Sequence, residues 1–492
     1  MQNGTLLAAV DLGSNSFRLE IGRFEHGHIH KVEYLKETVR QGNGLDDNRN
    51  LTQDALERGW ACLARFGERL AGFPREHVRA VATQTLREAR NRDDFLTRGS
   101  EVLGYPIDVV SGIEEARLIY QGVARLLPQS DERRLVVDIG GRSTELILGE
   151  QFSPKSVASF RVGSVAWSSR YFADGAFTPQ AFLAAEIAAK AVLDEALAVF
   201  RRDAWDVAYG SSGTAGAVGD VLAAMGGPKG IITRSGLEAL RDKLLRAQSA
   251  DRVRMEGLKE DRRAVIGGGI SILRAVFDLL DIDEMQVAQG ALRQGALYDL
   301  LDREQPETDL RTDTVNALMQ RFAVDVPHAE RVAETARKLF LQAAQPDSER
   351  AARKLEWAAK LHEVGCRISH SDYHRHGAYI LDNTDAAGFA LPELHRLSVL
   401  VLGQRGKVRK LEADLSDAIF ALQLLCLRLA VALCHARRAP DISGIRLQAE
   451  PGVFTLSAPP PWSKAYPQSA HLLQEEVTAW QKTPWDLHIV GD

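Results

Sequence analysis

The sequence predicts an α/β protein made of two related halves, followed by a helical region and a small β-containing end. Three observations predict this architecture. The stretch LAAVDLGSNSFRLEIG at 7–22 returns in pattern as LVVDIGGRSTELILG at 135–149. Strand and helix patterns alternate to about residue 304, and helical patterns dominate from there to about 440. At 492 residues, the chain is also too long for one core.

The first predicted half covers residues 1–127. Three successive strands are expected, at 6–13, 17–24 and 28–35. Residues 52–73 predict an amphipathic helix, because Leu56, Trp60 and Leu63 recur near helical spacing. Strand-to-helix segments are then expected at 77–89 and 105–127.

The second predicted half covers residues 128–304 and restarts the pattern with a strand hairpin at 133–149. A long alanine-rich helix is expected near 179–200, and a strand, glycine-rich turn and helix at 205–222. Two apolar segments complete the half, at 264–280 and 284–301.

A third region, 305–440, is predicted to be helical. A polar, proline-containing linker at 303–312 precedes it. The expected helical segments are 314–324, 328–345, 351–365, 392–406 and 417–438. The last region, 441–492, has alternating apolar pieces at 445–450 and 452–458 and predicts a small β-containing appendage.

Charge and cysteine usage exclude several classes of protein. The net charge of −5 argues against a general nucleic-acid binder, although a local basic groove could still receive an anionic substrate. The four cysteines form no CxxC pair, so zinc-finger spacing is absent and free thiols in a reducing cytoplasm are expected. The first residues lack the basic start of a signal peptide.

No apolar run reaches the length of a membrane span. The nearest, at 422–438, is interrupted by Arg428 and predicts a buried helix. We therefore expect a cytoplasmic protein without stable membrane insertion, and leave peripheral membrane association open.

The two matching stretches each place an aspartate and glycines after an apolar strand. Glycines after Asp11 and Asp138 permit tight turns, whose N–H groups can form an anion-binding nest. A carboxylate ending a buried strand is costly unless a cation or a water held by one accompanies it. Two ordinary hairpins would explain one such pattern, but its repetition favours two loops that grip a phosphate chain and its metal. No GxGxxG follows the first strand, which excludes a Rossmann site.

Acidic residues near these turns are candidates for chemistry. Ser111 and Glu114 have the spacing of a capping box, which gives Glu114 a structural task. Glu115 has no such task and could activate a water, or it could be a solvated residue that favours the helix dipole. Glu145 follows Asp138 by seven residues and could join a metal site or be solvated.

Other segments suit an anion. Arg87 follows Thr83 and Thr85 at a strand-to-helix junction, which suits a phosphate, although a surface arginine is the commoner explanation. The glycine-rich turn at 210–214 resembles another anion cradle.

A histidine cluster lies in the helical region and could bind a metal or receive anions; it comprises His362, Glu363, His370, His374 and His376. A basic run at 405–410 adds Arg405, Lys407, Arg409 and Lys410 and is either a solvated surface or part of a positive wall.

Six segments together resemble the exopolyphosphatase and guanosine pentaphosphate phosphohydrolase family of the actin-like superfamily: AAVDLGSNSFRL, VATQTLREA, VVSGIEEARLIYQGV, LVVDIGGRSTELILG, YGSSGT and ALRQGALYDLL. The resemblance covers residues 5–435. It implies two ribonuclease-H-like (actin-like) halves with an active-site cleft between them, then an HD-like helical domain.

The same resemblance implies roles for particular residues. Glu115 corresponds to the general base, and Asp11, Asp138 and Glu145 to the acidic residues of a Mg²⁺ site that could also take Mn²⁺. The implied phosphate-binding residues are Ser14, Asn15, Arg18, Arg87, Gly140, Gly141, Arg142, Ser143, Thr144, Ser212 and Gly213. Arg142 stands where the family commonly has glycine, and could add a phosphate contact or restrict the loop.

In the helical region, Glu363 stands where metal-dependent HD hydrolases have aspartate, so the resemblance favours polyphosphate binding there over a metal site. The implied distal polyphosphate path comprises His374, His376, Arg405 and Lys407. A homodimer is also expected, because this basic surface could extend a partner's groove.

The function expected first is that of an exopolyphosphatase, which releases orthophosphate from the end of inorganic polyphosphate. The alternative is removal of the 5′-terminal phosphate of guanosine pentaphosphate, which would use the same cleft. A catalytically silent sensor is a third hypothesis, and the complete set of acidic residues argues against it. A sugar kinase is a fourth, and no sugar site is evident.

Overall fold

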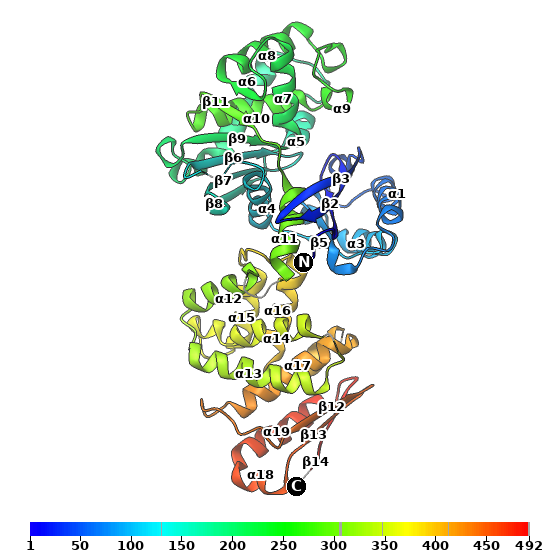
Figure 1. Cartoon of the computed structure of the whole chain (residues 1–492), viewed down its shortest axis with the longest axis vertical. Coiled ribbons are helices and arrows are strands. Elements are labelled where there is room, and N and C mark those ends of the chain that lie inside the picture. The colour runs from blue at the N-terminus through cyan, green and yellow to red at the C-terminus, as the bar shows by residue number, and fades with distance from the viewer. Residues whose placement is uncertain (129, 305–307, 347, 412, 491–492) are drawn as a thin grey trace. The chain divides into compact units, whose positions relative to one another are not determined.

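The structure, a computed structural model, describes residues 1–128, 130–304, 308–346, 348–411 and 413–490. The chain divides into two compact units, Met1–Asp309 and Leu310–Asp492 (Figure 1). The predicted fold class is confirmed: the first unit is α/β, and the second is helical with a small C-terminal sheet. Part of the expected linker at 303–312 falls on 305–307, outside the described residues.

The first half is built on a five-stranded sheet with the order β3-β2-β1-β4-β5. Its strands are β1 (Leu6–Leu12), β2 (Phe17–Glu25), β3 (His28–Glu37), β4 (Val78–Ala82) and β5 (Ile107–Val109). The first three pair antiparallel, and β4 and β5 add in parallel. The three predicted strands and the two strand-to-helix segments are confirmed.

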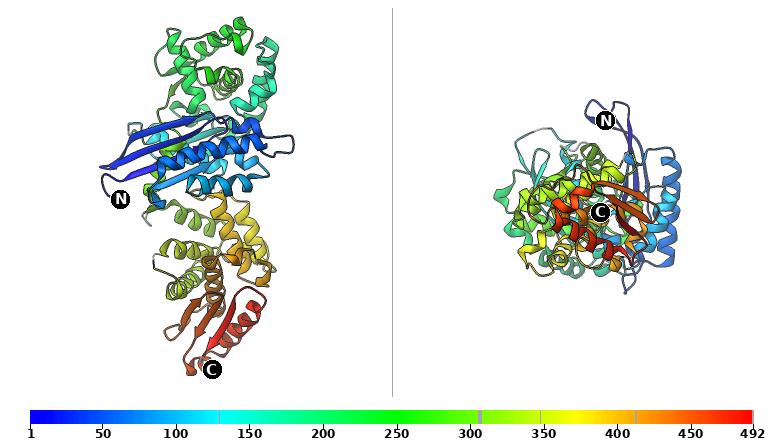
Figure 2. Two further views of the ribbon diagram at one scale, coloured as in Figure 1. Left: turned by 90° about the vertical axis from the view of Figure 1, so that its right-hand side faces the viewer. Right: turned by 90° about the horizontal axis from the view of Figure 1, so that it is seen from below.

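Four α-helices accompany this sheet: α1 (Gln53–Leu70), α2 (Gln84–Glu88), α3 (Arg92–Leu103) and α4 (Gly112–Ala124). The Thr52 hydroxyl accepts a bond from the Ala55 N–H and so starts α1 where the polar-to-apolar pattern begins. Helices α1 and α3 pack against each other beside the sheet (Figures 1 and 2).

The second half repeats the arrangement in a six-stranded sheet with the order β10-β11-β9-β6-β7-β8. Its strands are β6 (Arg133–Ile139), β7 (Thr144–Glu150), β8 (Ser153–Phe160), β9 (Val207–Ser211), β10 (Ile231–Thr233) and β11 (Glu284–Val287). Strands β6, β7 and β8 pair antiparallel, and β9 joins β6 in parallel. The β6–β7–β8 hairpins thus repeat β1–β2–β3, as the matching stretches predict.

Seven helices belong to this half: α5 (Ser164–Tyr171), α6 (Pro179–Leu193), α7 (Ser212–Ala224), α8 (Arg234–Ala247), α9 (Glu260–Arg263), α10 (Ile266–Leu279) and α11 (Leu292–Glu304). The alanine-rich helix is shorter than the predicted 179–200, because a 3₁₀ turn at Asp194–Ala198 follows α6. Proline at its first position and the Thr178 cap fix its start.

The two halves are joined by crossing helices. Helix α4 of the first half packs on β7 and β8, whereas α11 packs on β1, and the two helices contact each other. Their backbones approach so closely that a Cβ on Gly295 would overlap the Leu118 carbonyl oxygen. The glycine therefore permits the close packing of α11 on α4.

In the described part of the second unit, six α-helices precede the sheet: α12 (Leu310–Arg321), α13 (Val326–Ala343), α14 (Glu349–Lys360), α15 (Tyr373–Asp382), α16 (Leu391–Gly403) and α17 (Ala418–Leu433). Helix α15 was not predicted, since its histidines obscure the helical period. The interpretation of 422–438 as a buried helix is confirmed up to Leu433, where α17 ends, whereas residues 435–438 are exposed and not helical. Arg428 is neutralised within the helix by Glu476. Among the described residues, no helix is both long and apolar enough to cross a membrane.

The C-terminal sheet has the order β12-β13-β14 and comprises β12 (Arg446–Glu450), β13 (Val453–Ser457) and β14 (Asp486–Val490). The predicted β-containing end is confirmed, but it also holds α18 (Pro460–Ala465) and α19 (Pro467–Trp480). Trp480 and Phe454 belong to the same apolar core as the helices before the sheet. The domain boundaries at 127/128, 304/305 and 440/441 stay predictions.

Candidate active site

The turns that follow β1 and β6 face each other across a gap between the two sheets. A Cβ on Gly141 would lie only 3.0 Å from the Ser14 Cβ, so glycine permits this approach of the second turn to the first. The second turn is closed by a bond from the Gly140 N–H to the Ser143 carbonyl, and the Ser164 N–H at the start of α5 also donates to Gly140. The first turn is held by the Arg40 and Gly42 N–H groups, which donate to the Asn15 and Ser14 carbonyls.

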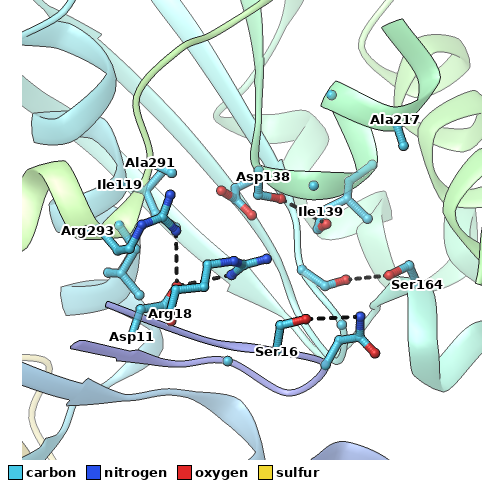
Figure 3. A pocket seen from close by; sticks show the side chains of 18 of the residues that line it. Asp11, Ser16, Arg18, Ile119, Asp138, Ile139, Ser164, Ala217, Ala291 and Arg293 are labelled. Carbon is cyan, nitrogen blue, oxygen red and sulfur yellow. Dashed lines mark hydrogen bonds and ion pairs between the residues drawn. The ribbon is translucent and has the colours of Figure 1, made fainter. Parts of the chain in front are cut away.

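A cavity of about 360 Å³ lies between these turns (Figure 3). The sequence-predicted residues that line it are Asp11, Ser14, Asn15, Arg18, Glu115, Asp138, Gly140, Gly141, Ser143, Ser212 and Gly213. They come from β1, β2, α4, β6, the two turns and α7. The structure thus brings together most of the residues that the repeated pattern and the family resemblance single out.

The aspartate of the first hairpin is paired with arginines. Asp11 and Arg18 are cross-strand neighbours in β1 and β2, and the Arg18 Nη1 lies 3.1 Å from the Asp11 Oδ2. Arg293 at the start of α11 places its Nη1 3.5 Å from the same oxygen. The two guanidinium groups converge on Asp11 in Figure 3, so this buried carboxylate is already balanced.

The second hairpin places an acid opposite an acid. Asp138 and Glu145 are cross-strand neighbours in β6 and β7, and both are buried. Burial raises the pKa of Glu145 well above its ordinary value, and the carboxylates of Glu115 and Asp138 raise it further. Burial also raises the pKa of Asp138. Neither side chain forms an ion pair within the described part of the chain, although the Ser159 hydroxyl donates to Glu145.

Glu115 projects from the first turn of α4 and is only 7 % exposed, which contradicts the alternative of a solvated residue. The Arg87 Nη1 lies 2.7 Å from its Oε2. Burial raises the pKa of Glu115, and Arg87 offsets part of that increase. Glu115 therefore lines the cavity as a carboxyl group that accepts a proton more readily than an ordinary glutamate.

The expected capping box forms only in part. The Ser111 hydroxyl accepts a bond from the Glu114 N–H, as predicted. The Glu114 carboxylate does not return to Ser111 but binds the Arg117 guanidinium at 2.7 and 2.8 Å. Arg117 also pairs with Asp299 of α11, so Glu114 belongs to a buried network that fixes α4 to α11.

Three predicted phosphate-binding residues do not line the cavity. The Arg142 guanidinium pairs with Glu88 at 2.7 Å and donates to the Gly42 carbonyl, so it links the second turn to the first half. The Thr144 hydroxyl is buried and donates to the Val162 carbonyl at 2.6 Å. Arg87 is not a lining residue, but it binds Glu115, which is one. Of the two roles considered for Arg142, this geometry favours restriction of the loop.

Several lining residues were missed in the sequence, most of them cationic: Lys36, Asp220, Lys259, Arg262 and Arg293. Lys36 on β3 pairs with Asp261 on α9 at 2.6 Å and so connects the two halves beside the cavity. Lys259 and Arg262 lie in a short polar segment without hydrophobic periodicity, so no sequence pattern indicated that they line a cavity. Arg293 lies in one of the segments that resemble the family. It was missed because its partner Asp11 is distant in sequence.

The donor set of this cavity fits a divalent cation. Asp138 lines the cavity, whereas its buried cross-strand neighbour Glu145 is not among the lining residues. Neither carboxylate has a cationic partner among the described residues, and carboxylate oxygens are the ligands that Mg²⁺ and Mn²⁺ prefer. A cation would offset the burial that raises the pKa values of both carboxyl groups, and also the repulsion from Glu115 and Asp138 that raises the pKa of Glu145 further. Asp11 lines the same cavity but already has two arginine partners.

The four residues of the predicted distal path lie in the second unit. His374 and His376 are on α15, and Arg405 and Lys407 are exposed in the turn after α16. A Cβ on Gly406 would lie 3.8 Å from the His374 Nε2, so this turn borders α15. The polyphosphate path itself stays a prediction.

Two related α/β halves with facing turns define an enzyme of the actin-like fold, and the cavity between them, which is lined by both carboxylates and cationic side chains, suits phosphoryl chemistry. The Ppx/GppA phosphatase family matches residues 21–304, and its domain III matches residues 310–477. The chain belongs to the Ppx/GppA phosphatase family and is a hydrolase that acts on phosphoric anhydrides.

Individual relatives agree with this family. A protein of Vibrio atlanticus is 38 % identical over 98 % of both chains, and one of Aeromonas hydrophila is 37 % identical over 100 % of both. Both are named guanosine-5′-triphosphate,3′-diphosphate pyrophosphatase. An exopolyphosphatase from Cytophaga hutchinsonii, 24 % identical, superposes with a TM-score of 0.54 over 61 % of this chain and 98 % of its own, which supports the fold.

Proposed function

We propose that the protein hydrolyses the terminal 5′ phosphoanhydride of guanosine pentaphosphate and releases orthophosphate and guanosine tetraphosphate. The observation that carries this proposal is the near full-length similarity to relatives named for that nucleotide. The sequence alone placed inorganic polyphosphate first and guanosine pentaphosphate second. The comparisons favour the opposite order.

The shape of the cavity supports a nucleotide. Besides the carboxylates, the cavity is lined by Gly216, Ala217 and Asp220 of α7, and no atom lies within 4 Å of a Cβ placed on Gly216. A carboxylate there can accept bonds from the N–H groups of a guanine edge, whereas it would repel a bare polyphosphate chain. Lys259 and Arg262 line the same part of the cavity and suit additional phosphate groups.

A cation site completes the proposed chemistry. Asp138 and Glu145 would hold Mg²⁺ or Mn²⁺, which supplies charge neutralisation at the phosphoryl group that is transferred. Asp11 stays a predicted member of this site, and its arginine partners predict a smaller contribution than that of Asp138.

The protein's own side chains then perform the remaining steps. Glu115 orients a water and accepts its proton while the water oxygen bonds to the terminal phosphorus. The bond from that phosphorus to the bridging oxygen breaks, and the electron pair leaves with the shortened nucleotide. Arg18 and the turn N–H groups stabilise the phosphate oxygens, because fixed donors need no reorganisation during the reaction.

Inorganic polyphosphate is the second candidate substrate. The cationic lining favours it, since Arg18, Lys36 and Arg262 could bind any chain of phosphates. A polyphosphate end would use the same base and the same cation site, so these residues do not separate the two substrates.

Substrate comparison with an Asp220→Asn variant tests the proposal. Loss of hydrogen bonds from guanine to a charged acceptor should raise KM for guanosine pentaphosphate by about 10- to 100-fold, equivalent to roughly 1.5–3 kcal/mol. Turnover of long and short polyphosphate should not fall. Asp242→Asn, an exposed change on α8, is the matched control. A higher kcat/KM for polyphosphate than for the nucleotide in the wild-type protein would overturn the proposal.

A further inference from the structure

The second unit groups two imidazoles and a carboxylate that the proposed reaction does not use. His328 lies in the first turn of α13, and His362 and Glu363 follow the end of α14. One potential ligand atom from each of the three side chains lies within 4.8 Å of the others. Helices distant in sequence thus converge on one point inside this unit.

The imidazoles are buried and poorly satisfied by the protein itself. His328 is 5 % exposed and His362 is 1 % exposed. The Nδ1 of His328 has no hydrogen-bond partner among the described residues. The Nδ1 of His362 lies 2.7 Å from the Ala359 carbonyl and must donate to it, which leaves a lone pair on Nε2. A backbone carbonyl that orients one ring nitrogen is typical of a histidine that binds a metal through the other.

An arginine currently supplies positive charge at this cluster. Arg437, after α17, donates from Nη2 to the Glu363 Oε1 at 2.8 Å and from Nη1 to the Asp325 Oδ2 at 2.8 Å. Its side chain is half exposed, whereas that of Glu363 is 15 % exposed. Arg437 can therefore release Glu363 toward a stronger cation and keep Asp325 as a partner.

We propose that His328, His362 and Glu363 form a binding site for a divalent first-row transition metal such as Zn²⁺, and that Arg437 withdraws from Glu363 when the metal binds. Two nitrogen ligands and one carboxylate suit Zn²⁺, Fe²⁺ or Co²⁺, whereas Mg²⁺ takes oxygen ligands. The site thus differs in chemistry from the carboxylate pair Asp138 and Glu145 of the first unit. A bound metal would tie the start of α13 to the end of α14, and the proposal does not depend on the substrate of the enzyme.

Zinc binding to the full chain tests this site. Equilibrium dialysis against Zn²⁺ in excess Mg²⁺, which occupies the acidic cavity, counts the bound zinc. Wild type should bind one equivalent that His328→Gln and Glu363→Gln lose or bind at least about tenfold more weakly. His471→Gln, an exposed histidine on α19 that is not one of the three proposed ligands, should retain it. Zinc should raise Tm in the wild type and in the control only.

Arg437→Ala provides a readout that a folding defect cannot imitate. Removal of the competing guanidinium should tighten zinc binding several-fold, because the metal no longer has to displace a cation from Glu363. Equal zinc stoichiometry and affinity in the wild type, His328→Gln and Glu363→Gln would overturn the site. Unchanged or weaker binding by Arg437→Ala would overturn the displacement of arginine.

Discussion

The two hairpins that begin the two halves have the same backbone pattern and opposite electrostatics. In the first, Asp11 faces Arg18 across β1 and β2, and in the second, Asp138 faces Glu145 across β6 and β7. Each pair is separated by seven residues in sequence. The first pair is neutral as a unit, and the second is doubly negative when ionised. The difference indicates that the charge of Asp11 is neutralised within the protein, whereas the Asp138–Glu145 pair requires a bound cation.

Glu115 lies between these cases. It is buried like Asp138 and Glu145, but it has an arginine partner like Asp11. Arg87 keeps Glu115 oriented without occupying both of its oxygens, because the ion pair involves only the Glu115 Oε2. A carboxyl group with a raised pKa and one fixed partner is suited to accept a proton from water.

The largest expected effect comes from making the second hairpin electrostatically like the first. Glu145→Arg should remove the cation site, since Asp138 would then be neutralised by arginine. We expect kcat/KM to fall about 10⁴-fold, equivalent to roughly 5 kcal/mol, while the folded state is retained. Steady-state kinetics across a Mg²⁺ titration, with Tm as the folding check, measures both.

The control is Glu145→Gln, in which the new side chain has nearly the same size as the native glutamate. It removes one charge without adding a guanidinium, so a smaller loss and a weaker Mg²⁺ dependence are expected. Wild-type kcat/KM in Glu145→Arg would show that the acid pair does not hold the metal.

A smaller effect is expected from Glu115→Gln, which leaves both hairpins unchanged. Loss of the general base should reduce kcat about 10³-fold, within the usual range for such groups. Substrate binding should persist, because the phosphate-binding turns keep their donors. Kinetics together with direct binding of a slowly hydrolysed analogue checks this expectation, and full turnover would exclude Glu115 as the base.

The smallest effect concerns pH. Because burial raises the pKa of Glu115, the ionised base is present above that pKa, and activity should be lost as pH falls through it, at a higher pH than for an ordinary glutamate. Arg87 lowers this pKa, so Arg87→Gln should move the acid limb of kcat/KM to still higher pH. A pH–rate profile of both proteins tests the direction, and a shift toward lower pH would contradict it.

The elements around the site could be predicted because they depend on local patterns. The strands at 6–13 and 17–24 follow from their apolar residues on either side of a glycine-containing turn, and the start of α4 follows from Ser111. The meeting of the two turns could also be predicted, since related halves place equivalent turns at equivalent ends. Arg142 shows the limit: its charge suits a phosphate, but Glu88 from the other half binds it.

The sequence by itself determined the two related halves, the position of each turn and the acidic residues they carry, because hydrophobic period and glycine placement act over a few residues. Only the tertiary structure decided which carboxylates have arginine partners. Asp11 receives Arg293 across 282 residues of chain, whereas Asp138 and Glu145 receive no such partner among the described residues. Burial and pairing of charges depend on contacts between distant segments, and those contacts determine where a cation is required.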